Sequence, residues 1–343
     1  MTRYKIILEY NGTTLIGWQS QNHGGVGLSQ TDLCKGDFGT KSPHRSVQDF
    51  VEESIFRFCG QRVDVVSAGR TDAGVHALGM AASFELNDSP LGGESASALH
   101  EPVGGQNDAT CPPTENPSDF RLPPKGGAIT VMRAMNFYLG QMGAPIAVLS
   151  CESVADDFHA RFSCKRRHYR YIILNRRAPV VLDNNMVWWI PRPLDIDAMR
   201  AAAQKLVGNH DWTSFRSSEC QAKSPVKTLD EIKISLCPPT ASPVAMLRLC
   251  GSPQGGSNSR ERTTPPLGGV GEAKAEPVGG QYIIIDFSAR SFLHHQVRNM
   301  VGTLVEIGLG KPYDIDEIFA AKNRAAAGPT APAGGLYFVG AEY

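Results

Sequence analysis

Residues 68–77 combine side chains that acid–base or nucleophilic chemistry needs. Their sequence is AGRTDAGVHA, which brings a cation, a carboxylate and an imidazole close together along the chain. Gly69 and Gly74 let the backbone take a positive φ angle or approach a ligand closely. Asp72 on such a loop can act as a nucleophile or a base, and Arg70 beside it favours the charged carboxylate. The alternative is an ordinary polar turn with a local Arg–Asp pair.

These ten consecutive residues resemble the active-site motif of the TruA-type tRNA pseudouridine synthases. The resemblance implies that Asp72 is the catalytic nucleophile and that Arg70 lies beside it at the substrate. It also implies isomerisation of uridine to pseudouridine at positions 38, 39 and 40 in the anticodon stem-loop of tRNA. No cofactor is implied, because nothing is oxidised or phosphorylated. The expected partners are tRNA and a second copy of the chain, since members of the family act as homodimers.

A second stretch, residues 159–171, carries many cations and no acid, with aromatic residues between them. Cations hold phosphates and rings stack on bases, so this mixture favours binding of a nucleic acid. The alternative is a solvated amphipathic strand. The stretch resembles a second family motif, in which Tyr169 would lie against the target base and could remove its C5 proton. Tyr171, two residues along the same strand face, is expected to pack. The candidate tRNA-binding residues are Arg161, Lys165, Arg166, Arg167 and Arg170.

A third stretch, residues 292–302, reads FLHHQVRNMVG and includes a histidine pair. If both histidines lie on a helix, their side chains point about 100° apart, whereas a zinc pair prefers positions i and i+4. No metal is therefore expected. The stretch resembles a family motif whose arginine, here Arg298, pairs with the catalytic aspartate. Leu336 belongs to a last motif, in which it would pack under the target base. The alternative for Leu336 is an ordinary closing strand.

Composition gives little direct indication of function. The chain has 343 residues, with 34 Lys and Arg against 34 Asp and Glu, so net charge does not indicate nucleic acid. The eight cysteines are scattered and form no C-x-x-C pair, which argues against a structural zinc site or a disulfide scaffold and fits a reducing compartment. The first residues form no apolar signal segment. A soluble cytoplasmic protein is expected.

The apolar patterns predict two successive β-α-β-β-α-β units, an α+β arrangement of ferredoxin-like or RNA-recognition-like halves. In the first unit they predict helices over 46–59 and 129–139 and strands over 4–10, 63–66, 80–86 and 146–151. In the second they predict helices over 195–207 and 292–308 and strands over 167–174, 228–236, 282–289 and 336–341. The resemblance implies the pseudouridine synthase fold, with joined sheets and a central cleft. The predicted domains are 1–151 and 152–343.

Three segments rich in Gly, Pro or Ser interrupt this pattern, at about 23–45, 88–125 and 238–281. The text PLGG followed by EPVGGQ occurs in both of the later two segments. Such sequences bury too little apolar surface to compensate their ordering entropy, so mobile surface loops are expected. The alternative is that these loops bind RNA.

Two other classes of protein remain as alternatives. One is a non-catalytic RNA-binding protein of the same fold. The other is a metal-assisted hydrolase that uses Asp72, His76 and His294, although these residues lack a ligand spacing.

The chain also departs from the family in one place: residues 136–142 read NFYLGQM, without the proline and aspartate that often follow this asparagine. That departure puts local RNA contacts in doubt.

Overall fold

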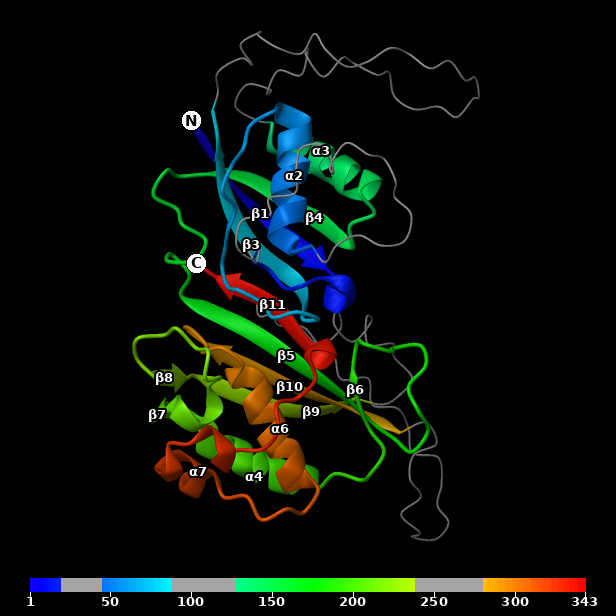
Figure 1. Ribbon diagram of the computed structural model, residues 1–343, viewed down its shortest axis with the longest axis vertical. Helices are drawn as coiled ribbons and strands as arrows, with labels where there is room; N and C mark the ends of the chain where they lie inside the picture. Colours follow the sequence, from blue (N-terminus) through cyan, green and yellow to red (C-terminus); the bar gives the residue numbers. More distant parts are fainter. Residues whose placement is uncertain (20–44, 88–126, 238–279) are drawn as a thin grey trace, which may run out of the picture. The chain divides into compact units, whose positions relative to one another are not determined.

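The computed structural model describes residues 1–19, 45–87, 127–237 and 280–343 (Figure 1). Apart from a few flanking residues, the three predicted inserts lie outside these ranges. The chain divides into two compact units, Met1–Lys165 with Gly340–Tyr343, and Arg166–Val339. These are called unit 1 and unit 2. The domain boundary after residue 151 stays a prediction.

Unit 1 combines a small antiparallel sheet with two helices that contact each other. Its sheet has the order β4-β1-β3, and β2 pairs with β3. The first strand alternates buried and less buried residues, so one of its faces belongs to the core. Figure 1 shows α2 and α3 side by side. The elements are β1 (Thr2–Tyr10), α2 (Val47–Cys59), β2 (Val66–Ser67), β3 (His76–Leu86), α3 (Ala128–Gln141) and β4 (Ile146–Val154).

The start and end of α2 follow from local sequence. Ser46 Oγ accepts the Asp49 N–H at 3.1 Å, and the Asp49 carboxylate accepts the Ser46 N–H at 3.0 Å. This is the predicted capping box, which satisfies N–H groups that the helix itself cannot. Gly60 ends the helix with a φ angle of 71°, a conformation that glycine adopts without steric cost. The predicted helix is confirmed.

Unit 2 contains a larger sheet of order β11-β5-β10-β9, in which β10 runs antiparallel to both β5 and β9. The strand β6 pairs in parallel with β5, and β7 and β8 form a separate antiparallel pair. Its strands are β5 (Arg166–Asn175), β6 (Trp188–Ile190), β7 (Gly208–Asp211), β8 (Val226–Leu229), β9 (Glu231–Cys237), β10 (Gln281–Ala289) and β11 (Leu336–Glu342), whose last residues belong to unit 1. Its helices are α4 (Ile196–Leu206), α6 (Gln296–Gly308), α7 (Ile315–Ala321), η3 (Trp212–Phe215), η4 (Arg324–Ala326) and η5 (Ala333–Gly335).

Across the described ranges the chain is a mixed protein with five α-helices and mostly antiparallel strands. Within those ranges, none of the helices is long and apolar enough to cross a bilayer.

Two strand predictions are wrong in detail. The run 63–66 is strand only at its last residue, where β2 begins. The run 228–236 is two strands, because Asp230 separates β8 from β9 and its N–H donates to the Ser288 carbonyl at 2.9 Å. The strand β8 then pairs with β7 rather than with the larger sheet. Apolar periodicity within the run could not distinguish these two pairing partners.

The helix that was predicted over 292–308 is α6, and it begins four residues later than predicted. Its first residue is Gln296, and the side chain of Gln296 accepts the Leu293 N–H at 2.8 Å in the preceding turn. His295 has a φ angle of 62°, which lies outside the helical region. The apolar residues before Gln296 therefore belong to a turn, although their spacing resembles that of a helix.

Candidate active site

The loop that carries Asp72 is held by the segment that follows β1. The Trp18 N–H donates to the Thr71 carbonyl at 3.0 Å, and the hydroxyl groups of Tyr10 and Thr71 are hydrogen bonded at 2.8 Å. Gly17 has a φ angle of 101°, and a Cβ there would lie only 2.5 Å from the Thr71 carbonyl oxygen. Thr71 is buried and Asp72 is half-buried. The backbone around Asp72 is thus fixed while the residue as a whole keeps some exposure.

His76 supports this loop from the first position of β3. The ring is almost fully buried, and its Nδ1 accepts the Gly12 N–H at 3.0 Å. A Cβ on Gly12 would lie 2.0 Å from the Val75 carbonyl oxygen, so the two segments are in direct backbone contact. The His76 ring is therefore part of the packing around the loop. This position disfavours His76 as the metal ligand that the hydrolase alternative requires. Arg70 is exposed on the same loop.

In unit 2, Tyr169 lies on β5 with its ring held by two others. Ring centroids of Phe292 and Phe338 lie 5.0 and 5.1 Å from that of Tyr169, both in edge contact. Tyr171 is fully buried, and its hydroxyl donates to the Pro332 carbonyl at 2.7 Å. Burial raises the pKa of Tyr171 well above its ordinary value. Tyr171 therefore packs, while Tyr169 has a fixed ring orientation.

Arg298 lies in the first turn of α6 and is half-buried. Its Nε–H donates to the Ala331 carbonyl at 2.8 Å, and the Ala331 N–H donates to the Arg298 carbonyl at 3.1 Å. The side chain and backbone of Arg298 are thus both tied to one residue far along the chain. Its pairing with Asp72 stays a prediction.

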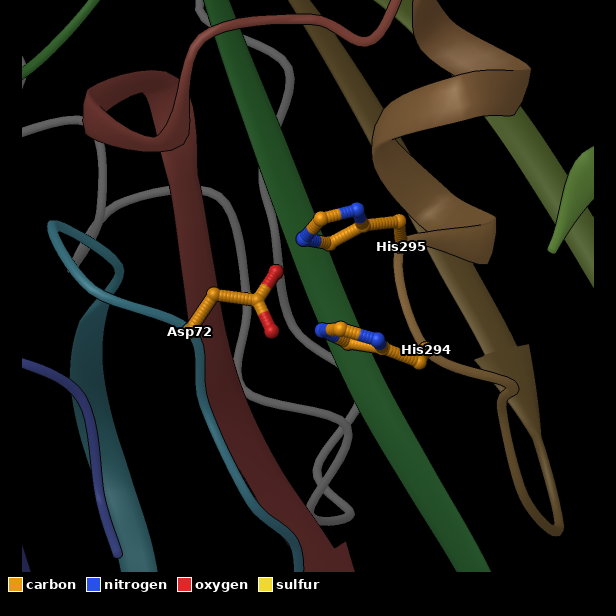
Figure 2. Close-up of side chains that lie close together, drawn as sticks. All are labelled: Asp72, His294 and His295. Atoms are coloured by element: carbon orange, nitrogen blue, oxygen red, sulfur yellow. The ribbon is translucent and has the colours of Figure 1, made fainter. Parts of the chain in front are cut away.

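His294 and His295 occupy the turn that leads into α6, and Figure 2 draws them together with Asp72 of unit 1. The two imidazole rings lie side by side, with centroids 4.0 Å apart and planes inclined by 37°. The expected helical position of the two histidines is therefore wrong, because both precede α6, and helical spacing gives no argument against a metal here.

Leu336 is the first residue of β11 and is buried. The residue before it, Gly335, faces Tyr171 so closely that a Cβ would lie 2.7 Å from the Tyr171 ring. The residue after it, Tyr337, donates its hydroxyl to the Met186 carbonyl at 2.7 Å. The position of Leu336 is therefore fixed from both sides.

The five predicted tRNA-binding cations differ in exposure. Arg161, Lys165 and Arg166 are exposed, although Arg166 forms an ion pair with Asp230 at 3.2 Å. Arg170 is buried and binds Asp286 through both carboxylate oxygens, at 2.6 and 3.2 Å. Arg167 is also buried and donates to a backbone carbonyl. Of the five, the three exposed cations are the more accessible to a phosphate.

Sequence reasoning missed the residues that hold these elements in place. Gly12 and Gly17 fix the Asp72 loop, and their close contacts could have been suspected only from two glycines beside an apolar strand. Asn299 follows Arg298 directly and is fully buried. Its amide oxygen accepts the Arg324 Nη2–H at 3.0 Å. No local pattern marks Arg324.

Comparison with known proteins connects these residues to one class of protein, the pseudouridine synthases. A sequence profile described as tRNA pseudouridine synthase matches residues 202–343. The chain is 41% identical to "tRNA pseudouridine synthase A" of Orientia tsutsugamushi (strain Ikeda) and 40% identical to the protein of that name from Rhodospirillum centenum. The corresponding protein of Bartonella bacilliformis is 35% identical. Each alignment covers 100% of both proteins. The chain belongs to the tRNA pseudouridine synthase family.

Proposed function

We propose that this chain is an isomerase that converts uridine to pseudouridine in tRNA, with Asp72 as the nucleophile. The proposed targets are positions 38, 39 and 40 of the anticodon stem-loop. The observation that carries the reaction is the relationship over the whole chain to proteins named tRNA pseudouridine synthase A. The fixed loop around the half-buried Asp72 supports its role, because a nucleophile needs a defined position and some access to the substrate.

We further propose that the two units are ferredoxin-like halves with joined sheets, and that Asp72 and Arg298 meet in a cleft. A carboxylate partly withdrawn from water is stabilised in its charged form by a nearby cation. Arg298 can supply this charge from α6, and Arg70 can supply more from the loop itself. The support for this pairing is the match of both stretches to family motifs.

The target uridine must leave the base stack before it can react, which costs a few kcal/mol. Tyr169 and Leu336 are the proposed contacts to the extruded base. Both are held firmly, Tyr169 by two aromatic rings and Leu336 by its fixed neighbours. A rigid binding surface reduces the ordering cost when the base enters.

In the proposed reaction Asp72 attacks C6 of uracil or C1′ of the ribose, or promotes elimination to a glycal. The N1–C1′ bond breaks, the base rotates, a C5–C1′ bond forms, and any bond made to Asp72 is broken again. C5 loses a proton to a general base, for which Tyr169 is the candidate, and N1 gains a proton in its place. The number of bonds and electrons is unchanged, so the reaction can proceed on side chains of the protein.

The exposed cations Arg161, Lys165 and Arg166 are the proposed phosphate contacts, with Arg167 and Arg170 supporting the same strand. We infer that the enzyme acts in the cytoplasm, which the scattered cysteines fit, and that it is a homodimer, as the resemblance implies. Sedimentation of the purified protein tests this inference: a species of one chain's mass at micromolar concentration would contradict the homodimer.

Incubation of the full chain with an unmodified tRNA transcript, followed by nucleoside analysis, tests the reaction. Pseudouridine should form when uridine occupies position 38, 39 or 40. It should not form when all three positions carry cytidine. Binding of the transcript without any pseudouridine would favour the non-catalytic RNA-binding alternative, and pseudouridine elsewhere in the transcript would contradict the proposed targets.

A further inference from the structure

A segment of unit 2, residues 324–332, runs across α6 in direct backbone contact with it. We call this segment the strap. A Cβ on Gly302 of α6 would lie 1.7 Å from the Pro329 carbonyl oxygen, and a Cβ on Gly328 would lie 2.8 Å from the Thr303 Cα. Real Cβ atoms do not approach so closely, so glycine is required on both sides. These backbone contacts therefore fix the distance between the strap and α6.

The Arg324 side chain forms hydrogen bonds both to α6 and to other residues of the strap. Its Nη1 donates to the carbonyls of Gly328 at 2.8 Å and Ala327 at 3.3 Å, and its Nη2 donates to Asn299 Oδ1 and Thr330 Oγ1, both at 3.0 Å. Thr330 in turn donates to Asn299 Oδ1 at 2.7 Å. The guanidinium thus cross-links α6 to the strap through four uncharged oxygen atoms.

These bonds require a side chain with several donors in one plane. Burial lowers the pKa of Arg324, but arginine remains charged in proteins. Its planar fork presents donors in fixed directions, which a lysine ammonium cannot do. The pattern is therefore specific for arginine.

Ala331, which follows Thr330 in the strap, is the residue that forms hydrogen bonds with Arg298. Its carbonyl accepts the Arg298 Nε–H at 2.8 Å, and its N–H donates to the Arg298 carbonyl at 3.1 Å. The carbonyl of Pro332 then accepts the Tyr171 hydroxyl at 2.7 Å. A shift of the strap would move the acceptor that orients Arg298.

We propose that Arg324 is a positioning residue for Arg298: by cross-linking the strap to α6, it fixes the Ala331 carbonyl that orients the Arg298 guanidinium. This inference rests on the proposed function, in which Arg298 acts beside Asp72. A misplacement of about 1 Å at a reacting group can cost roughly 100-fold in rate. Arg324 should therefore influence turnover without contacting the RNA.

Kinetics of Arg324→Ala and Arg324→Lys provide the first test. With the tRNA transcript as substrate, kcat should fall at least about tenfold for Arg324→Ala while KM stays within about twofold. Arg324→Lys should recover part of the loss. Thr330→Val, which removes one hydroxyl from the network, should give a smaller loss of the same kind. Ile232→Val, a core truncation in β9 of the same unit, serves as the control for general destabilisation and should leave kcat unchanged.

A double-mutant cycle separates action through Arg298 from general damage. If Arg324 acts only by orienting Arg298, Arg324→Ala should lower kcat less than about twofold when Arg298 has already been replaced by Lys. If Arg324→Ala lowered kcat by the same factor in the Arg298→Lys background as in the wild type, the proposal would be overturned.

Amide hydrogen exchange gives a readout that does not depend on activity. The N–H groups of Gly328 and Ala331 should exchange at least about tenfold faster in Arg324→Ala, and at the wild-type rate in Ile232→Val. Unchanged exchange at both amides in Arg324→Ala would overturn the proposal even if turnover fell. If exchange rose but Arg298→Lys kept full turnover, Arg324 would still hold the strap, whereas the proposed role of Arg298 in the reaction would be wrong.

Discussion

Arg170 and Arg298 show two uses of a guanidinium in the same unit. Arg170 is buried and binds both oxygens of Asp286, so its charge is matched within the fold. Arg298 is half-buried, and its Nε binds an uncharged carbonyl that fixes its direction. The first arrangement stabilises two neighbouring strands. The second orients a charge, as the proposed function requires.

Replacement of these two arginines should therefore separate activity from stability. Arg298→Ala should lower turnover by at least about 100-fold, and Arg298→Lys should restore part of it, because lysine keeps the charge but loses the planar fork. Arg170→Ala should instead destabilise the fold by about 2 kcal/mol, because it leaves Asp286 without its partner, although partial exposure of Asp286 reduces the cost.

Single-turnover kinetics and urea unfolding of each variant provide the measurements. If Arg298→Ala only weakened tRNA binding and kept its turnover, Arg298 would join the phosphate-contacting residues instead.

At the scale of elements, Asn136 connects α3 to β4. Its Oδ1 accepts the Val148 N–H at 2.7 Å, and its Nδ2 donates to the Val148 carbonyl at 2.9 Å. Since β4 lies at the end of its sheet within unit 1, these are backbone groups that an unprotected edge would leave exposed. Asn136 therefore substitutes for a neighbouring strand, and the departure from the family motif begins four residues further on, at Gly140.

Asn136→Ala should lower the free energy of unfolding by about 1 kcal/mol, because the loss of two hydrogen bonds exceeds the gain in helix propensity. Arg133→Ala, at an exposed position of the same helix, should change it by less than about 0.5 kcal/mol. Urea unfolding followed by circular dichroism gives both values. Equal midpoints for the two variants would mean that Asn136 does not stabilise the edge.

Asp211 at the end of β7 caps η3, and its environment predicts a contribution to stability that depends on pH. Its Oδ1 accepts the hydroxyl and the N–H of Thr213, at 2.6 and 3.1 Å, and Lys322 lies 3.4 Å from its Oδ2. The Thr213 hydroxyl first, and then its N–H and Lys322, lower the pKa of Asp211. The folded state thus holds this proton less tightly than the unfolded state, whose pKa is about 3.9.

The stability contributed by the Asp211 charge is therefore present at neutral pH and is lost as the pH falls below about 4. Asp211→Asn should be less stable than the wild type at pH 7, by up to about 1 kcal/mol. The difference should shrink between pH 4 and pH 3. Urea midpoints across this range measure it, and a difference independent of pH would show that the charge is not involved.

Particular elements show what the sequence could and could not predict. The capping box of α2 lies within four consecutive residues, so its start was predictable. The start of α6 depends on the φ angle of His295 and on the side chain of Gln296, and apolar spacing reports neither. Similarly, the motif pointed to Asp72 as a candidate nucleophile, but the contacts from Gly17 and Trp18 that hold its loop come from a distant part of the chain. Long-range backbone contacts of this kind leave no local pattern.

At the scale of the whole molecule, positive and negative charges balance, so any affinity for RNA must come from local groups of cations. Arg166 is exposed but shares its charge with Asp230 at 3.2 Å. Arg166→Ala should weaken tRNA binding and reduce the slope of log K against log salt by roughly 0.7 to 0.9. Asp230→Asn should act in the opposite direction, because it releases the guanidinium.

Lys205→Ala is the matched control, since Lys205 is exposed on α4 and is paired with Asp314 and Asp316. Filter binding at several salt concentrations measures all three variants. An unchanged slope for Arg166→Ala would remove Arg166 from the set of phosphate contacts.

The central claim is that Asp72 is the nucleophile of a tRNA pseudouridine synthase. The most direct measurement compares wild type and Asp72→Asn for pseudouridine formed in an anticodon stem-loop substrate and for affinity toward the same RNA. The amide nearly preserves the shape of the side chain but removes the attacking carboxylate. We expect no detectable pseudouridine from Asp72→Asn, with RNA affinity within about tenfold of wild type. Turnover by Asp72→Asn above about a tenth of the wild-type rate would contradict the claim.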